Sequence, residues 1–399
     1  WTDATWNPVV GCSKVSPGCD NCYAIGQAER IVRMGGKGGT KYEGTVEPGS
    51  GEWTGTVKCV PEALDQPLRW KKPRLIFVNS MSDLFHPDVP LDFICEVWSV
   101  MANAPQHVFQ ILTKRPQRMQ KIVDAIAWTG GTNGDPWEAY LWPGPWRSED
   151  DEVTYDMLDG GGEVPLANVW LGTSIESNSF AWRADYLRKT PAAVRWISAE
   201  PLVGPLDDLD LTSIDWLVVG GESGPNARPM HPDWALDLLR LARCVYCDGE
   251  GERFNDKSWS PEWVGQEPTH DNYGYSWCLS CDSIEDPTAF LFKQWGNWAP
   301  IGPLYDAWRY RNAEHCQIAD DARTEAACLM AELGDHRVIQ LERNGIPSDG
   351  YQPADDRTWL MVRNGTKKAS GRELDGRTWD EYPLDARDRE IADSGEGSA

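Results

Sequence analysis

Short runs of consecutive apolar residues limit the fold of this chain more than any other feature. Each run ends abruptly in polar residues, and helix-like stretches lie between the runs. Continuous rather than alternating apolar character predicts strands that are buried on both faces, as in a parallel sheet. The runs lie at residues 74–83, 107–115, 168–176, 194–200, 215–222 and 289–295.

The stretches between these runs have the character of α-helices. In Pro232–Arg243, Pro232 and Asp233 suit a helix N-terminus, and Leu236 and Leu239 share an apolar face. The other predicted helices are Leu91–Met101, Arg118–Trp128 and Ser179–Arg188. Alternation of strands and helices predicts an α/β fold, a partial or complete (βα) TIM-like barrel, in which the polar strand ends share one face. A doubly wound open sheet fits the pattern less well.

Glycine-rich, polar and acidic stretches interrupt this pattern and look inserted. We expect a barrel with insertions, a metal-binding module inserted into it, and a charged tail that is disordered. The barrel comprises 1–243 and 286–384 with insertions at 35–53, 129–165 and 300–356, the module comprises 244–285, and the tail comprises 385–399.

Three cysteines lie close together near the start of the chain, in the pattern Cys12-x6-Cys19-x2-Cys22. If Val9-Val10 ends the first strand, this loop follows directly, and the turn signal Pro17-Gly18 lets it fold back so that the three thiols meet. Three thiolates suit a [4Fe–4S] cluster with one iron open. A structural zinc site with a distant fourth ligand and a redox role for the thiols remain open from the spacing alone.

A second group of four cysteines forms two CxxC pairs, Cys244 with Cys247 and Cys278 with Cys281. This is the ligand set of a closed zinc ribbon, so we expect a zinc knuckle that folds the inserted segment. An auxiliary iron–sulfur cluster is the rival interpretation.

The charge balance argues against one class of function. With 62 acidic and 38 basic residues the net charge is −24, which disfavours broad, non-specific DNA binding. Local basic clusters remain at Lys71–Arg74, at Lys114-Arg115, and at Lys367-Lys368 with Arg372 and Arg377. No apolar stretch approaches the roughly 18 residues of a membrane span, and no secretory signal is visible. We therefore expect a soluble protein of the cytoplasm without a membrane partner.

The motif TWNPVVGCSKVSPGCDNCYA resembles the opening of a phage- and prophage-encoded three-Cys-motif family of uncharacterised proteins. The resemblance continues through VNSMSDLFHPDVP, ILTKRPQRM, VWLGTSIES, RWISAEPLVGPL, WLVVGGESG, FLFKQWG and the segment 365–376. That family is similar to radical S-adenosylmethionine (SAM) enzymes, with a layout like the spore photoproduct lyase group. This chain has six residues between its first two cysteines, where the usual radical SAM pattern has three.

The resemblance implies a [4Fe–4S] cluster on Cys12, Cys19 and Cys22 that cleaves SAM to a 5′-deoxyadenosyl radical, with an external electron donor. Lys114 is the expected partner of the SAM carboxylate, because similar enzymes place a lysine on the third strand. The other predicted contacts lie at strand ends and comprise Ser80, Ser82 and Asp83 (amino group), Ser174 and Glu176 (ribose or amino group), and Glu200 and Glu222 (cofactor or substrate).

The substrate is less constrained. A pocket lined by Glu200, Glu222 and Lys293 suits a polar group such as a nucleobase, and the resemblance favours a nucleobase-containing substrate. His86, beside Pro87, is either part of the site or structural. The alternatives are a radical SAM enzyme for a peptide or small metabolite, and a non-enzymatic binding protein stabilised by zinc at both cysteine sites.

Overall fold

The computed structural model describes residues 2–129, 165–242 and 288–303, with the short segments 338–341, 347–348, 359–363, 370–374, 377–380 and 382–383. Contacts between residues divide the chain into two compact units, Trp1–Glu200 and Pro201–Ala399. In the described residues, no helix is both long and apolar enough to cross a membrane. The predicted zinc module, the segment 130–164 and the predicted tail lie outside the described residues.

The first unit contains a parallel sheet built from the predicted apolar runs. Neighbouring strands pair in the order β1-β6-β7-β8-β9. Their bounds are β1 Ala4–Trp6, β6 Leu75–Val78, β7 Val108–Thr113, β8 Val169–Ser174 and β9 Val194–Ala199. Every residue of β8 and most of β7 is buried, which explains why these strands appear as continuous apolar runs.

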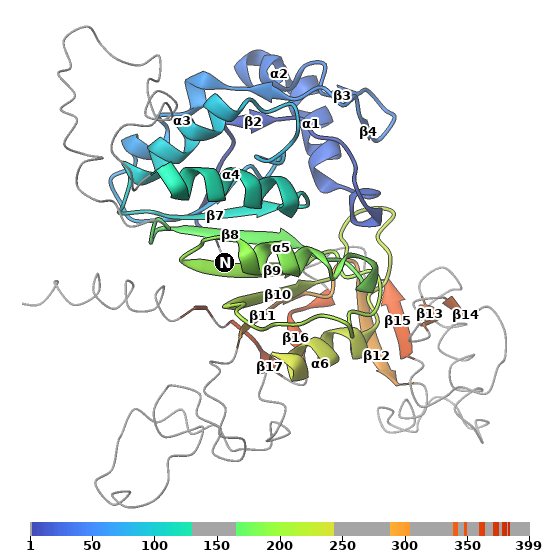
Figure 1. The fold of residues 1–399 in the computed structure, drawn as a ribbon. Helices are drawn as coiled ribbons and strands as arrows, with labels where there is room; N and C mark the ends of the chain where they lie inside the picture. Colours follow the sequence, from blue (N-terminus) through green and yellow to red (C-terminus); the bar gives the residue numbers. More distant parts are fainter. Residues whose placement is uncertain are drawn as a thin grey trace, which may run out of the picture. The chain divides into compact units, whose positions relative to one another are not determined.

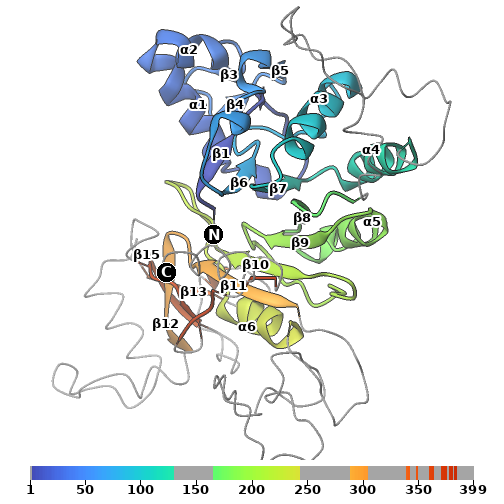
Figure 2. The same ribbon diagram turned by 90° about the vertical axis from the view of Figure 1, so that its left-hand side faces the viewer.

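Three helices connect the successive strands β6 to β9. They are α3 Leu91–Ala102, α4 Pro116–Thr129 and α5 Arg183–Lys189, and Figures 1 and 2 place all three on the same face of the strands. Right-handed crossovers put every helix on one side of a sheet when strand order follows chain order. The strand order of this unit does so, and it has no reversal of the kind that defines a doubly wound sheet. The parallel βα organisation is compatible with a partial TIM-like barrel.

The segment that carries the cysteine loop forms a small layer of its own. After Cys22 come α1 Tyr23–Met34, α2 Gly36–Tyr42 and three short strands, β3 Val46–Glu47, β4 Glu52–Trp53 and β5 Lys58–Cys59. Ala24, Ile25 and Ala28 on one face of α1 pack with Tyr42 and Val46 in a common apolar cluster. The predicted insertion 35–53 is thus part of a packed core.

One interpretation of the sequence is wrong. Val9–Val10 does not end the first parallel strand, because β1 ends at Trp6 and β2 Val9–Val10 pairs antiparallel with β5. Pro8 lies between the two strands, and its lack of an N–H interrupts the sheet ladder. The cysteine loop therefore follows β2.

Large aromatic side chains fill the interior of the first unit. Trp6, Phe109, Trp170 and Trp196 are fully buried or nearly so. Gly172 on β8 makes room for one of them, because a Cβ there would lie 2.4 Å from the Trp196 ring. Short 3₁₀ turns at Pro17–Cys19, Pro61–Ala63, Pro67–Arg69 and Asn178–Phe180 complete this unit.

The second unit begins with another βαβ element. β10 Trp216–Gly220 and β11 Ala289–Gln294 pair in parallel, and α6 Pro232–Leu241 lies between them in the chain. An antiparallel sheet follows in the order β12-β15-β13-β14, with a hairpin beyond it. The bounds are β12 Trp298–Pro303, β13 Val338–Leu341, β14 Pro347–Ser348, β15 Trp359–Arg363, β16 Glu373–Leu374 and β17 Arg377–Thr378. The predicted insertion 300–356 contributes strands to this sheet.

Candidate functional site

The cysteine loop of the first unit is held against the end of β6. Gly11 forms a parallel bridge with Ser82, and the Ser82 hydroxyl donates to the Val9 carbonyl at 2.7 Å. The loop then turns through Pro17–Cys19, and Cys22 precedes the first residue of α1. Local turn chemistry and one bridge thus bring the loop to the carboxyl ends of the parallel strands.

Arg115, just after β7, ties this loop to the neighbouring strand ends. Its Nη1 donates to Asp83 Oδ2 at 2.8 Å and lies 3.9 Å from Cys12 Sγ. Its Nη2 donates to the hydroxyl and the carbonyl of Ser13 at 2.9 and 3.1 Å. The guanidinium therefore bridges the carboxylate of one strand end to the first cysteine of the loop.

Asp83 is the centre of this bridge and is itself buried. Besides Arg115 it accepts from the Thr113 hydroxyl at 2.7 Å and from the main-chain N–H groups of Phe85 and Lys114. Four donors thus engage the carboxylate, which fixes the ends of β6 and β7 relative to each other. Its predicted contact with the SAM amino group stays a prediction.

His86 supports the loop from the other side. Its Nδ1 accepts from the Asp88 N–H, so the Nε2 nitrogen carries the proton and donates to the Ser13 hydroxyl at 2.8 Å. This tautomer leaves Nε2 unable to act as a base toward Ser13. His86 is therefore a positioning group for the loop, and the sequence had left its role open.

Burial lowers the pKa of His86 below its ordinary 6.5, and the Arg115 charge lowers it further. The unfolded chain then takes up a proton as pH falls through about 6.5 while the folded chain does not, so unfolding becomes easier in that window. We expect the free energy of unfolding of the wild type to fall more between pH 7.5 and pH 5.5 than that of His86→Gln. Urea denaturation at both pH values measures this difference, and equal pH dependence would contradict it.

Each thiol of the loop interacts electrostatically with one cation from a later segment, Lys114 and Arg115 just after β7 and Arg183 at the start of α5. Burial raises the pKa of Cys12 to about 12, Asp83 raises it as well, and Arg115 opposes both. Burial also raises the pKa of Cys22, and Lys114 opposes this shift. Burial lowers the pKa of Arg183, whereas Glu176 and Cys19 raise it. The pairs are thus Cys12 with Arg115, Cys19 with Arg183 and Cys22 with Lys114.

Glu176, just after β8, links two of these cations beneath the loop. The side chain is fully buried, and its Oε2 lies 2.8 Å from Arg183 Nη1 and 3.9 Å from Lys114 Nζ. Gly18 packs directly on it, because a Cβ there would lie 3.1 Å from Glu176 Oε1. Within the part of the chain that the structure describes, Oε1 has no hydrogen-bond partner.

Breaking this buried ion pair should destabilise the protein. Arg183 and Glu176 are both nearly inaccessible to solvent, and removal of Arg183 leaves the buried carboxylate to the more distant Lys114, whose Nζ lies 3.9 Å away. We expect Arg183→Met to lower the free energy of unfolding by about 3–5 kcal/mol. The control is Asp185→Asn in the same helix, because the Arg188–Asp185 pair has a largely exposed carboxylate and contributes about 0–1 kcal/mol. Equal losses in urea denaturation would contradict the expectation.

The remaining predicted site residues are placed as follows. Ser80 donates to the Asn7 side chain at 3.2 Å, and the Ser174 carbonyl at the end of β8 accepts from Arg183 at 2.8 Å. Glu200, just beyond β9, lies 3.5 Å from the Ser198 hydroxyl. All three belong to strand ends of the first unit, as predicted, and their contacts with SAM stay predictions.

In the second unit, Glu222 is buried and held by Arg228. Glu222 Oε2 accepts from the N–H and Nε of Arg228 at 2.8 and 3.0 Å, and Oε1 accepts from Nη2 at 2.7 Å. This geometry is a bidentate ion pair, which is among the stronger charge-assisted contacts. The other predicted group of the second unit, Cys244, Cys247, Cys278 and Cys281, lies outside the described residues.

A comparison with protein-family models identifies one family over nearly the whole chain. The model described as protein of unknown function (DUF5131) matches residues 1–274 and 265–383. The chain belongs to the DUF5131 family. No curated protein and no solved structure matches this sequence. The family description assigns no activity, which agrees with the predicted resemblance to uncharacterised proteins.

The donor set of this DUF5131 chain fits an iron–sulfur cluster in its chemistry. Three thiols lie on one loop, and Cys19 raises the pKa of Cys22, so these two sulfurs are electrostatically coupled. A cluster on three thiolates is anionic, and each thiol already has a cation beside it. Among the described residues, no three His, Cys, Asp or Glu side chains are gathered as a ready metal site.

Three of these functional neighbours had no signal in the DUF5131 sequence. Ser13, Arg183 and Arg118 reach the site only because packing brings distant segments together. Arg118, on the first turn of α4, donates through Nη2 to the Val89 carbonyl at 2.7 Å and through Nη1 to the His86 carbonyl. Arg118 follows the end of β7 by five residues, a pattern too common to be informative, and no sequence pattern marks Ser13 or Arg183.

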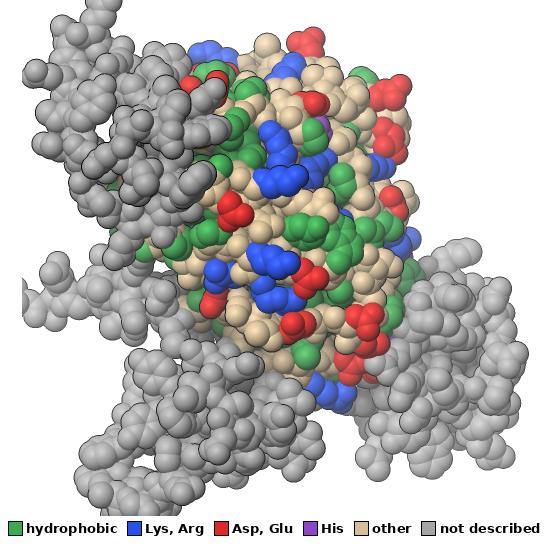
Figure 3. Space-filling view, in the orientation of Figure 1, with side chains coloured by type: hydrophobic (Ala, Val, Ile, Leu, Met, Phe, Trp, Pro, Cys, Tyr) green, Lys and Arg blue, Asp and Glu red, His purple; other side chains and the backbone are tan. Residues whose placement is uncertain are grey.

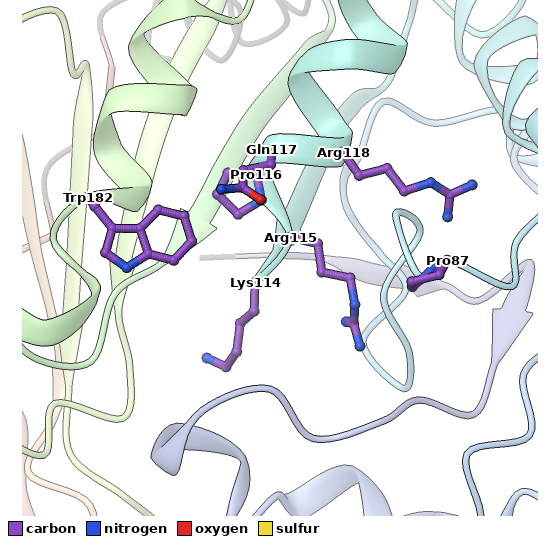
Figure 4. Close-up of a pocket in the computed structure, with 7 residues that line it drawn as sticks. All are labelled: Pro87, Lys114, Arg115, Pro116, Gln117, Arg118 and Trp182. Carbon is purple, nitrogen blue, oxygen red and sulfur yellow. The ribbon is translucent and has the colours of Figure 1, made fainter.

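A pocket of about 280 Å³ opens beside this site, at the N-terminus of α4 (Figure 4). Its lining includes Lys114, Arg115 and Arg118, and Trp182 at the start of α5. Figure 4 shows Lys114 between Trp182 and Arg115, with all three close to the loop segments of the site. On the molecular surface, Lys and Arg side chains lie beside apolar ones over α4 (Figure 3).

Proposed function

We propose that this chain is a radical SAM enzyme that holds a [4Fe–4S] cluster on Cys12, Cys19 and Cys22 and acts on a nucleobase-containing substrate. One observation supports it above the others, namely that a cation acts on each of the three thiols: Arg115 lies 3.9 Å from Cys12, Lys114 opposes the rise in the pKa of Cys22, and Cys19 raises the pKa of Arg183. Cations at a tri-thiolate site offset the negative charge that cluster assembly brings into a partly buried position.

The same cations and Glu176 supply partners for the amino-acid end of SAM. Lys114 presents an ammonium for a carboxylate, and the unpartnered Oε1 of Glu176 presents an acceptor for an ammonium or a hydroxyl. A buried carboxylate oxygen without a donor costs free energy unless a ligand satisfies it. These two side chains, 3.9 Å apart, thus suit a zwitterionic head group.

When bound, the cluster and SAM supply one-electron cleavage of the sulfonium and a carbon radical that removes hydrogen from the substrate. The protein contributes position, charge and exclusion of water. Asp83, Arg115 and His86 hold the loop that carries the thiols, and the buried Arg183–Glu176 pair supports the loop at Gly18.

Anaerobic reconstitution with iron and sulfide tests the proposal. We expect a brown protein that contains iron at the first cysteine group and that releases 5′-deoxyadenosine from SAM after chemical reduction. A colourless protein that binds zinc at both cysteine groups and forms no 5′-deoxyadenosine would contradict it. That result would identify instead a zinc-stabilised binding protein.

A further inference from the structure

The pocket at the N-terminus of α4 differs in charge from the rest of the molecule. The chain carries 62 acidic and 38 basic residues, yet the residues that line this pocket include three cations and no carboxylate. Such a reversal of the average charge is the electrostatic signature of an anion site. The charge of its lining therefore favours an anionic ligand.

Two of the three cations keep positive charge available. Arg118 donates to the carbonyls of His86 and Val89, which fixes the guanidinium without cancelling its charge. Lys114 shares the carboxylate of Glu176 with Arg183, so two cations face one anion there. Arg115, by contrast, is neutralised by Asp83 at 2.8 Å. Beyond the pocket rim, Asp88 is mostly exposed and contributes one opposing charge.

The N-terminus of α4 adds to this positive potential. The helix Pro116–Thr129 begins at the pocket, and the first turn of a helix of this length favours an anion by its dipole. The cations and the helix end act on the same space, and their combined preference is for phosphate or carboxylate.

Trp182 adds a flat apolar surface to the pocket. Trp182 is 42% exposed, whereas Trp6, Trp170 and Trp196 of the same unit are buried. Tyr186 supports the indole edge-on, with ring centroids 5.8 Å apart, and the Tyr186 hydroxyl accepts from Gln117 at 3.1 Å. A supported, half-exposed indole beside a lysine is the arrangement on which nucleobases stack in single-strand binding sites.

We infer that this pocket binds one nucleotide unit, with its phosphate at Arg118 and the start of α4 and its base on Trp182; Lys114 adds positive potential to the pocket but is the partner of the SAM carboxylate in the proposed function. The volume of about 280 Å³ lies just below the range of small-ligand pockets, about 300–1,000 Å³. The pocket therefore takes at most one nucleotide unit and not a stacked duplex. This inference names the substrate class within the proposed function, yet the binding that it describes requires neither iron nor SAM.

Fluorescence anisotropy of the full-length protein with a short fluorescein-labelled single strand tests the inference. A nucleoside 5′-monophosphate should displace the probe, whereas the nucleoside alone and inorganic phosphate alone should compete much less. Trp182→Ala should weaken binding about 5- to 150-fold, the equivalent of the 1–3 kcal/mol of base stacking, and Trp182→Phe should retain most of the affinity. Arg118→Gln should lower the slope of log Kd against log salt by about 0.7.

The control is Lys72→Gln, which removes the same charge from an exposed position outside the pocket and should leave affinity and slope unchanged. A strand that binds much tighter than the monophosphate identifies nucleic acid as the source of the nucleotide, and equal affinity identifies a free nucleotide. Absence of binding by the wild type would overturn the inference. Unchanged affinity in both Trp182→Ala and Arg118→Gln, or equal competition by inorganic phosphate, would overturn it too.

Failure of this inference is distinguishable from failure of the proposed function. A colourless protein that still binds the strand through Trp182 would contradict the radical SAM proposal and keep the nucleotide site. A brown protein that cleaves SAM but binds no nucleotide would do the opposite. Circular dichroism of each variant confirms that altered binding does not reflect unfolding.

Discussion

Alanine at Cys12, Cys19 or Cys22 should abolish iron incorporation and reduce 5′-deoxyadenosine formation to background. Each substitution removes one of only three thiolate ligands of the proposed cluster, and two remaining thiolates cannot hold a [4Fe–4S] cluster with an open iron. It also leaves one cation of the site without its thiol partner. Iron content and visible absorption after reconstitution measure the first effect, and chromatography of the reaction products measures the second.

Cys59→Ala provides the matched control. Cys59 lies on β5 within the same unit, is partly exposed and free, and belongs to neither cysteine group. This variant should incorporate as much iron as the wild type and form as much 5′-deoxyadenosine. Iron retained by all three loop variants, or lost equally by Cys59→Ala, would contradict the assignment of the cluster to the loop.

Gly11→Ala should destabilise the first unit more than the same substitution at any other glycine near the cysteine loop. Gly11 has φ +83°, and a Cβ there would lie 2.1 Å from the Thr56 carbonyl oxygen, which is a main-chain atom. The left-handed backbone costs about 1–3 kcal/mol for alanine and the overlap a further 1–3 kcal/mol, so we expect a loss of about 2–6 kcal/mol in the free energy of unfolding. Urea denaturation measures it.

Gly55→Ala separates the two contributions. Gly55 has nearly the same backbone angle, φ +84°, but a Cβ there would meet nothing within 4 Å. The loss of stability in this variant should be confined to the same backbone cost of about 1–3 kcal/mol. If the free energy of unfolding falls by the same amount in both variants, the close approach of Thr56 to Gly11 has no energetic importance.

The strands and helices of the βα units were predictable from the sequence because of how parallel strands are buried. β7 and β8 are covered on both faces, so nearly every position in them is apolar, and the polar residues begin where the strands end. Lys114 and Glu176 were recognisable for that reason. The helix α4 begins two residues before its predicted start and ends one residue after its predicted end.

Other features could not be predicted, because they depend on contacts between segments far apart in the chain. The chain leaves the parallel sheet before Pro8, and β2 pairs antiparallel with β5. Each of these strands has only two residues, which is too short for a recognisable sequence pattern. The ion pair of Glu176 with Arg183 requires the exact rotation of α5 against β8. The support of Ser13 by His86 likewise depends on how the loop folds over the end of β6.

The order of the strands has a consequence for how the protein is made. Because each strand of the parallel sheet in the first unit pairs with the preceding strand of that sheet, the sheet can grow from its N-terminal edge during translation. Cys12, Cys19 and Cys22 leave the ribosome long before Arg115, which lies 3.9 Å from Cys12, and Arg183, which interacts electrostatically with Cys19. The loop is therefore synthesised before the cations that act on its thiols. For the cluster that we propose, this interval would give iron and sulfide access to the loop.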